Sequence, residues 1–254
     1  MKEGKKIYFV SDVHLGAPQI DNSKEHERTF VNWLDSIKET AEAVYLLGDI
    51  FDFWFEYKKS IPKGFSRFLG KLCEFYDAGI PVHFFTGNHD IWIFDYLPAE
   101  TGIIVHKKPT IKEIDGFRFF IGHGDGLTKY EKKLKVYKWI FNNRVAQWFF
   151  RWLHPDVGIK IAQIWSGYNQ TKHKEAKFQG IENEWLVLWA NETLKNEHFD
   201  FFVFGHRHIT KDVNLNDKSR LIYLGDWISL FSYGEWDGEK FELKFNKDRE
   251  IYNL

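Results

Sequence analysis

Short, nearly continuous apolar runs alternate along the chain with stretches in which apolar side chains recur every three or four residues. The short runs predict buried β-strands at 7–10, 43–47, 82–86, 117–121, 199–204 and 221–224. The spacing over residues 26–38 and 65–78 predicts two amphipathic helices. This alternation predicts an α/β fold, with helices on the faces of a parallel or mixed sheet.

Two later segments depart from the alternation. Near the C-terminus, Asp237-Gly238 lies between two strand-like runs, which predicts a β-hairpin. Residues 128–194 are long, helical in period and separate two of the predicted strands. We therefore expect one domain spanning residues 1–254, with a helical cap inserted at about 128–194.

Composition narrows the classes of protein to consider. The net charge of −1 gives no electrostatic reason to expect nucleic acid as a partner. Aromatic residues make up 19% of the chain, more than a core needs, so some are expected to line a ligand site or an apolar surface. The single cysteine, Cys73, cannot form an internal disulfide, and the chain has neither a signal-peptide pattern nor an apolar run long enough for a membrane span. We expect a cytoplasmic protein that can still lie against a membrane surface.

Side chains of the kinds that bind metals follow five of the predicted strands. The motifs are Ser11-Asp12-Val13-His14, Gly48-Asp49-Ile50-Phe51-Asp52, Gly87-Asn88-His89-Asp90, Gly122-His123 and Gly205-His206-Arg207-His208. Any one of them is compatible with an ordinary turn, because Asp, Asn and Gly are common there. All five at strand ends favour a shared site, since open α/β sheets bind ligands at the carboxyl ends of their strands. Imidazole, carboxylate and amide donors without thiolates suit Mn, Fe or Zn rather than a structural zinc.

In this order the motifs resemble those of the calcineurin-like metallophosphoesterases, over residues 12–208. The resemblance implies a four-layer αββα sandwich and two divalent metal ions, with Mn expected and Fe or Zn as alternatives. It implies that Asp49 bridges the two metals. The remaining ligands would be Asp12, His14 and His208 for one metal, and Asn88, His123 and His206 for the other. Two metals about 3.5–4 Å apart can activate water and clamp the oxygens of a phosphoryl group.

The same resemblance assigns roles to three further residues. His89 would stabilise charge or protonate the leaving oxygen, and Asp90 would orient the His89 ring. Asp52 would support the ligands as a hydrogen-bond acceptor rather than bind a metal itself.

The predicted cap is basic and aromatic in its first half. Between Lys129 and Arg151 only Glu131 opposes the positive charges. Phe141, Trp148 and Trp152 recur at helical spacing, and Trp139 and Phe149 widen this face until the latter half of the segment is apolar almost all round. These five aromatic residues are expected to line a chamber for acyl chains. A basic, aromatic helix also fits a membrane interface, and the alternative is that these rings pack the cap onto the core. Asn169 and Lys172 are candidates for contacts with phosphate or sugar groups.

Within the family, the layout is similar to that of the UDP-2,3-diacylglucosamine diphosphatases of lipid A biosynthesis. The segments 46–54, 122–125 and 224–227 carry this similarity. It implies hydrolysis of a lipid-linked nucleotide, UDP-2,3-diacylglucosamine, to UMP and 2,3-diacylglucosamine 1-phosphate by an enzyme peripheral to the membrane. One position departs from that pattern, because those enzymes typically have Arg where this chain has His89. The departure keeps open a phosphatase or phosphodiesterase acting on another nucleotide or small phosphoester, and a non-catalytic binding module is the third possibility.

Overall fold

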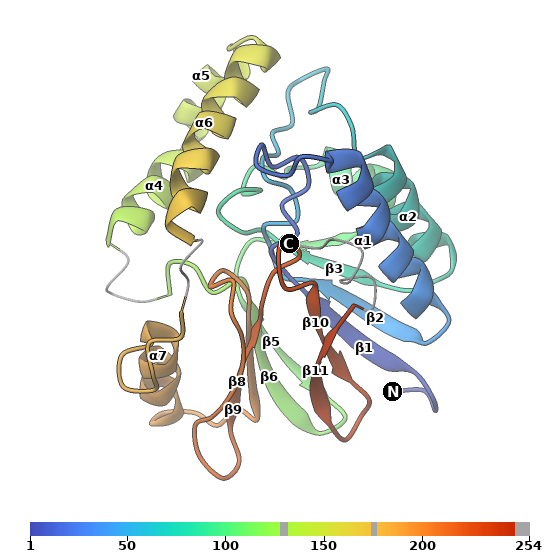
Figure 1. The fold of residues 1–254 in the computed structure, drawn as a ribbon, viewed down its shortest axis with the longest axis vertical. Coiled ribbons are helices and arrows are strands. Elements are labelled where there is room, and N and C mark those ends of the chain that lie inside the picture. Colours follow the sequence, from blue (N-terminus) through green and yellow to red (C-terminus); the bar gives the residue numbers. More distant parts are fainter. Residues whose placement is uncertain (128–131, 174–176, 247–254) are drawn as a thin grey trace.

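Two β-sheets packed face to face form the centre of the molecule (Figure 1). The computed structural model describes residues 1–127, 132–173 and 177–246, of which 132–135, 137 and 165–173 are described by backbone alone. The first sheet contains, in spatial order, β11 (Phe241–Phe245), β10 (Ser232–Trp236), β1 (Lys6–Val10), β2 (Ala41–Leu46), β3 (Val82–Phe85) and β4 (Ile104–His106). The second contains β5 (Thr110–Ile114), β6 (Phe117–Gly122), β7 (Phe201–Phe204), β9 (Arg220–Leu224) and β8 (Thr210–Asn214).

Helices cover the outer face of each sheet. The first sheet is covered by α1 (Ser23–Lys38), α2 (Ser66–Asp77) and α3 (Tyr96–Thr101), and the second by α7 (Trp185–Leu194) (Figure 1). Three apolar clusters fill the spaces between these layers, one under α1 and α2, one between the sheets and one under α7. The predicted four-layer αββα sandwich is therefore confirmed.

The strands that carry the motifs run parallel to one another. In the first sheet β1, β2 and β3 are parallel neighbours, and in the second β6 pairs in parallel with β7, which pairs in parallel with β9. Their carboxyl ends therefore open at the same edge of the sandwich. The predicted hairpin is also present, with Trp236 of β10 opposite Phe241 of β11.

Three strands have no counterpart among the predicted ones, namely β4, β5 and β8. Each is the outermost strand at one edge of its sheet. Because an edge strand is buried less completely, its sequence does not need a continuous apolar run, and alternate residues of β5 are exposed.

The cap consists of α4 (Lys132–Asn142), α5 (Arg144–Arg151) and α6 (Pro155–His173), which stand apart from the sandwich at the upper left of Figure 1. The predicted cap extends to residue 194, but α7 packs on the second sheet, where Leu186, Val187 and Ala190 are wholly buried. Helical spacing does not distinguish α7 from the cap helices, since periodicity shows that a helix has an apolar face and not what covers it. In the described part of the chain, every helix is too short or too polar to cross a bilayer.

Candidate metal centre

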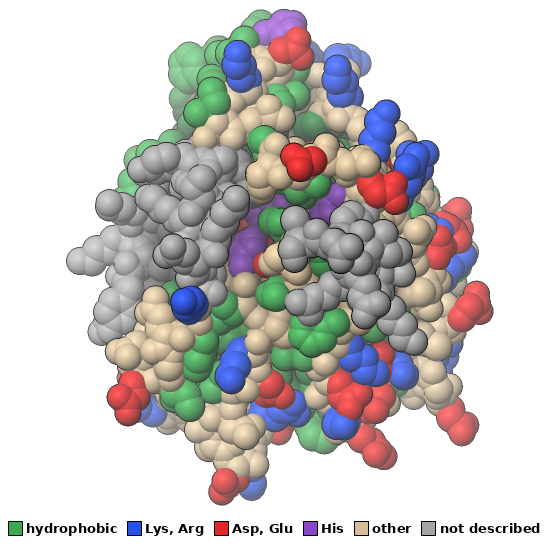
Figure 2. Space-filling model, in the orientation of Figure 1, with side chains coloured by type: hydrophobic (Ala, Val, Ile, Leu, Met, Phe, Trp, Pro, Cys, Tyr) green, Lys and Arg blue, Asp and Glu red, His purple; other side chains and the backbone are tan. Residues whose placement is uncertain are grey.

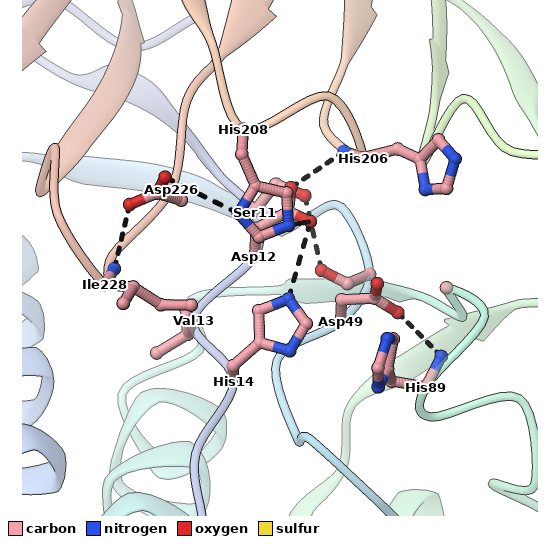
Figure 3. A network of polar contacts seen from close by, with 12 residues as sticks. Ser11, Asp12, Val13, His14, Asp49, His89, His206, His208, Asp226 and Ile228 are labelled. Atoms are coloured by element: carbon pink, nitrogen blue, oxygen red, sulfur yellow. Dashed lines mark hydrogen bonds and ion pairs between the residues drawn. The ribbon is translucent and has the colours of Figure 1, made fainter. Parts of the chain in front are cut away.

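Six of the seven predicted ligands form two clusters at the carboxyl ends of the parallel strands. Figure 3 labels all of them except His123. In each cluster the donor atoms of three side chains lie within 4.8 Å of one another; the clusters are Asp12, His14 and His208, and Asp49, His123 and His206. His208 Nε2 lies 3.3 Å from Asp12 Oδ1, and His123 Nε2 lies 3.2 Å from Asp49 Oδ2. The first cluster contains the three residues that the resemblance assigns to one metal, and the second contains the proposed bridging residue Asp49 with two of the three residues assigned to the other metal.

The seventh predicted ligand, Asn88, lies in the turn that closes against Asp49. The backbone N–H of His89 donates to Asp49 Oδ1 at 2.8 Å, so this turn is fixed beside the second cluster. A side chain at Gly87 would overlap the Asp49 carboxylate, which explains why glycine precedes Asn88.

The backbone at five of these residues is strained. Asp12, His14, Asp49, His206 and His208 all have φ between +50° and +65°, a left-handed conformation that is uncommon for residues other than glycine. Backbone hydrogen bonds between the loops hold it, including Asp12 N to Gly48 O and His14 N to Asp49 O. Such strain persists where the surroundings enforce it and gathers at functional sites, so it supports a functional assignment for this edge.

Each clustered imidazole that faces a carboxylate through Nε2 is held by an acceptor at Nδ1. His14 Nδ1 lies 3.2 Å from Asp52 Oδ1, and His123 Nδ1 donates to the carbonyl oxygen of Leu47 at 2.7 Å. His208 Nδ1 lies 3.5 Å from Asp226 Oδ2 (Figure 3). Metal-binding histidines have the same arrangement, which fixes the ring and directs the other nitrogen at the ion. Asp52 therefore occupies the supporting place expected of it. The sequence leaves the role of Asp226 open, because Gly225-Asp226 follows a strand in the same way as the five motifs but an ordinary loop explains it equally well.

Burial and close contact between opposite charges shift the protonation of the clusters. Burial alone would raise the pKa of Asp12, but the His208 and His14 rings outweigh it and hold that pKa well below its usual range. Burial alone would lower the pKa of His123, but the negative charge of Asp49 outweighs this effect and raises that pKa to about 10. Two ionised carboxylates inside the protein would be costly without nearby positive charge. Without a metal, protonated imidazoles provide that charge, and divalent cations would replace the protons.

The donor atoms fit a pair of divalent metals. Asn88 Oδ1 is inaccessible to solvent and has no hydrogen-bond partner among the residues that the structure describes. Asp12 Oδ1 and His123 Nε2 are equally buried, and the contacts they make are with oppositely charged members of the clusters. Buried polar atoms are ordinarily satisfied, so atoms of this kind that converge on one site indicate a missing partner. The donors are nitrogen and oxygen, which suits Mn, Fe or Zn.

Comparison with known proteins agrees with this geometry. The family description "Calcineurin-like phosphoesterase" matches residues 5–210 of the chain. The chain belongs to this family.

Among its relatives in the family, a UDP-2,3-diacylglucosamine hydrolase of Porphyromonas gingivalis is 38% identical over 260 aligned residues, which cover 96% of this chain and 99% of the relative. A protein of the same name from a Shewanella strain is 25% identical over 87% of this chain and 89% of its own length. A solved structure described as a dimetal phosphatase from Danio rerio aligns over 95% of this chain and 96% of its own, with a TM-score of 0.49 and 14% identity.

In this calcineurin-like phosphoesterase, His89 lies beside the clusters but is oriented differently from the prediction. Its Nδ1 lies 2.9 Å from the carbonyl oxygen of Asp52, and its ring meets the ring of His14 edge to face at 4.8 Å. Within the described residues, the Asp90 carboxylate instead accepts from the backbone N–H groups of Gly87, Ile50 and Phe51. The expectation that Asp90 orients the His89 ring is therefore wrong. Asp90 ties the two loops that carry Asp49 and Asn88 together, and the Asp52 carbonyl orients the ring.

A cavity of about 800 Å³ leads from the phosphoesterase centre into the cap. Asp52, Asn88 and His89 lie at its polar end, and the rest of its lining is apolar. The apolar lining comes from both the core and the cap: Phe53, Ile91, Trp92, Ile140, Phe141, Phe150, Leu153, Ile161, Ala162 and Ile164. Figure 2 shows histidine side chains at the floor of a hollow on this side of the molecule.

Only one of the five aromatic residues predicted to form this chamber lines it, namely Phe141. The other four point outward, with exposed fractions of 71%, 54%, 63% and 74% for Trp139, Trp148, Phe149 and Trp152. The prediction is wrong for these four because the second half of the segment is apolar almost all round, so spacing does not reveal its inner face. Phe150 faces inward instead, with its ring 4.7 Å from that of Trp92. The side chains of Asn169 and Lys172 lie outside the described residues.

Proposed function

We propose that the protein hydrolyses UDP-2,3-diacylglucosamine to UMP and 2,3-diacylglucosamine 1-phosphate. The observation that carries the proposal is the cavity of about 800 Å³, which is polar beside the metal clusters and apolar from there into the cap. A diphosphate lipid has the matching distribution, with its charge at one end and hydrocarbon at the other. Pockets of this form, mostly apolar with a few placed polar groups, are typical of small-molecule sites. The relative from Porphyromonas gingivalis, which bears that enzyme's name, supports the same substrate.

The seven proposed ligands would hold two metals, Mn²⁺ being expected, and these would supply Lewis-acid stabilisation and an activated water. The chain itself positions the reacting groups. Asp49 belongs to the second cluster, with one oxygen facing His123 and the other accepting from the His89 N–H, and its charge also acts on His14 of the first cluster. Since the Asp52 carbonyl occupies Nδ1 of His89, Nε2 is the ring atom that can reach the substrate. The apolar walls exclude water from the rest of the bound lipid.

The direct test is a product assay. With Mn²⁺ present, wild-type protein should release UMP from UDP-2,3-diacylglucosamine with a far higher kcat/KM than it shows for nitrophenyl phosphate mono- and diesters. Faster turnover of the small esters, with no UMP released, would refute the lipid substrate and leave a phosphoesterase of the family acting on another compound.

We expect kcat/KM to rise with acyl length in a series of UDP-glucosamine derivatives. Each buried methylene is worth about 0.8 kcal/mol, so removing four should cost roughly 3 kcal/mol, or about a hundredfold. Phe150→Ala, which removes a ring from the cavity wall, should flatten the series. Tyr76→Ala is the control, because this ring is 63% exposed on α2 and belongs neither to the cavity wall nor to the cap. A flat series for wild type, measured in detergent micelles, would exclude an acyl-chain chamber.

The proposed substrate resides in a bilayer, and the outer face of the cap suits contact with one. Trp148, Phe149 and Trp152 are exposed on or next to α5, and Arg144 and Arg151 begin and end that helix. Exposed aromatic side chains beside basic ones favour the interface of an anionic membrane. We therefore include in the proposal a cytoplasmic enzyme that binds the membrane surface peripherally.

Trp148→Ala combined with Trp152→Ala should weaken binding to phosphatidylglycerol-containing vesicles by at least tenfold, because each ring would lose about 1.5–3 kcal/mol of burial. Raising the salt concentration should weaken wild-type binding as well. Co-sedimentation measures both effects, and Tyr76→Ala, which removes an exposed ring on α2, is the control. Equal binding of the double variant and wild type would place the membrane contact elsewhere.

A further inference from the structure

One charged residue lies in sequence between two proposed metal ligands, and its side chain pairs with a carboxylate on another element. Arg207 separates His206 from His208, both of which have the left-handed backbone conformation. Its guanidinium forms a two-pronged contact with Glu184, with Nε donating to Oε1 at 2.7 Å and Nη2 to Oε2 at 3.3 Å. The Glu184 side chain is wholly buried and that of Arg207 is 13% exposed. Neither residue touches the cavity of the proposed substrate.

Glu184 is itself fixed by the segment that returns from the cap to α7. Its Oε2 accepts from the backbone N–H of Gln179 at 3.2 Å, and its own N–H donates to the carbonyl of Gly180 at 2.9 Å. The next residue, Trp185, meets the ring of His206 edge to face, with the ring centroids 6.0 Å apart. Two adjacent residues at the start of α7 therefore hold two adjacent residues of the metal-binding loop.

The pairing has both a geometric and an electrostatic effect on the loop. A planar guanidinium bound by both oxygens of a carboxylate has a defined orientation, so the backbone that carries it is fixed as well. This matters because His206 and His208 are held in an uncommon conformation that would otherwise relax. Glu184 also neutralises a buried cation, which would otherwise repel divalent ions bound by the neighbouring histidines.

We infer that Glu184 and Arg207 are a positioning pair for the metal centre, which sets the placement of His206 and His208 and removes the charge of Arg207 from their surroundings. The inference rests on the proposed metal ligands. It adds two residues that support the metal centre without binding metal or substrate themselves. Supporting residues of this kind typically change metal affinity by about 10–100-fold when they are altered.

The test is calorimetric titration of metal-free protein with Mn²⁺, together with the melting temperature of the metal-free form. Glu184→Gln keeps the size of the side chain and removes its charge, and it should weaken Mn²⁺ binding by about 10–100-fold. The matched control is Asp212→Asn, which breaks another two-pronged Arg–carboxylate contact, with Arg220, on strands of the same sheet. This control should leave Mn²⁺ affinity within about twofold of wild type.

If Glu184→Gln lowers the melting temperature but binds Mn²⁺ as wild type does, the pair is only structural and the inference is overturned. Should that variant fail to fold, Glu184→Asp is measured instead, because it keeps the charge and withdraws it from Arg207 by one methylene. The Mn²⁺ affinity of Glu184→Asp is also expected to be lower than that of the wild-type protein. An affinity equal to that of the wild-type protein would overturn the inference. Failure of the wild-type protein to bind Mn²⁺ at all would instead refute the proposed metal centre, and the inference with it.

Discussion

Asp49→Ala should abolish phosphoesterase activity and reduce the metal content of the purified protein. Asp49 is the one side chain expected to bind both metals, and its two oxygens face different partners, His123 on one side and the His89 N–H on the other. Removing it takes away the ligand that the two metals are expected to share, and it leaves His123 without the carboxylate that it faces. Residual activity at the level of the uncatalysed reaction, with less than one metal per chain by elemental analysis, is the expected result.

The control for this variant is Asp156→Ala, which removes a carboxylate that is 86% exposed at the start of α6. That variant should keep two metals and wild-type turnover. If Asp49→Ala retained both metals and most of its activity, the bridging role would be disproved, and the two clusters would have to act as independent sites.

His89→Ala should slow turnover by about 10²–10⁴-fold and leave the metals in place, the range expected for loss of a proton donor or charge stabiliser. The ring is held at the polar end of the cavity by the Asp52 carbonyl and packs against His14. Burial lowers the pKa of His89, against the pull of the Asp49 charge, so the neutral form of the imidazole is favoured at neutral pH. Single-turnover rates, measured with metal content, separate the two effects.

Loss of metal from His89→Ala would contradict that role. The structure contains a third group of possible donors, formed by His14, Asp52 and His89, and such a loss would place His89 among the ligands. His198→Ala is the control, because that ring is about half exposed and pairs with Asp200, away from the centre. It should change neither turnover nor metal content.

The placement of the ligands could be predicted from the sequence because it depends on local features. A buried parallel strand is a short apolar run, and the residue after it has to lie at the carboxyl edge of the sheet. That rule places Asp12, Asp49 and His123 at one edge before any contact is known. It does not identify the partner of each ring nitrogen. Asp90 is adjacent to His89 in sequence, yet the carbonyl of Asp52, from another loop, meets the ring.

The cap shows where sequence pattern is insufficient. In α5 the inward-facing ring is Phe150, while its neighbour Phe149 is exposed, and nothing in their chemistry separates them. Only the side from which α5 meets the core decides between them, and there the Phe150 ring packs against Phe55 and Trp92, with ring centroids 4.8 and 4.7 Å apart. The C-terminal boundary of the cap cannot be read from the sequence for the same reason. The sequence of α7 is as helical in pattern as that of α6, but α7 packs on the second sheet.

The strands on either side of the cap are direct neighbours in the second sheet. Phe119 of β6 pairs with Phe201 of β7, and Gly122 with Phe204, although the whole insertion lies between them in the chain. The inserted segment therefore leaves the sheet and returns to it at adjacent strands. Doubling the length of such a connecting segment costs only about 0.6 kcal/mol of closure entropy. Evolution can thus exchange residues 132–173 for another insertion without disturbing the strands that carry the metal ligands. The same phosphoryl chemistry can then serve a new class of substrate through a change in this one segment.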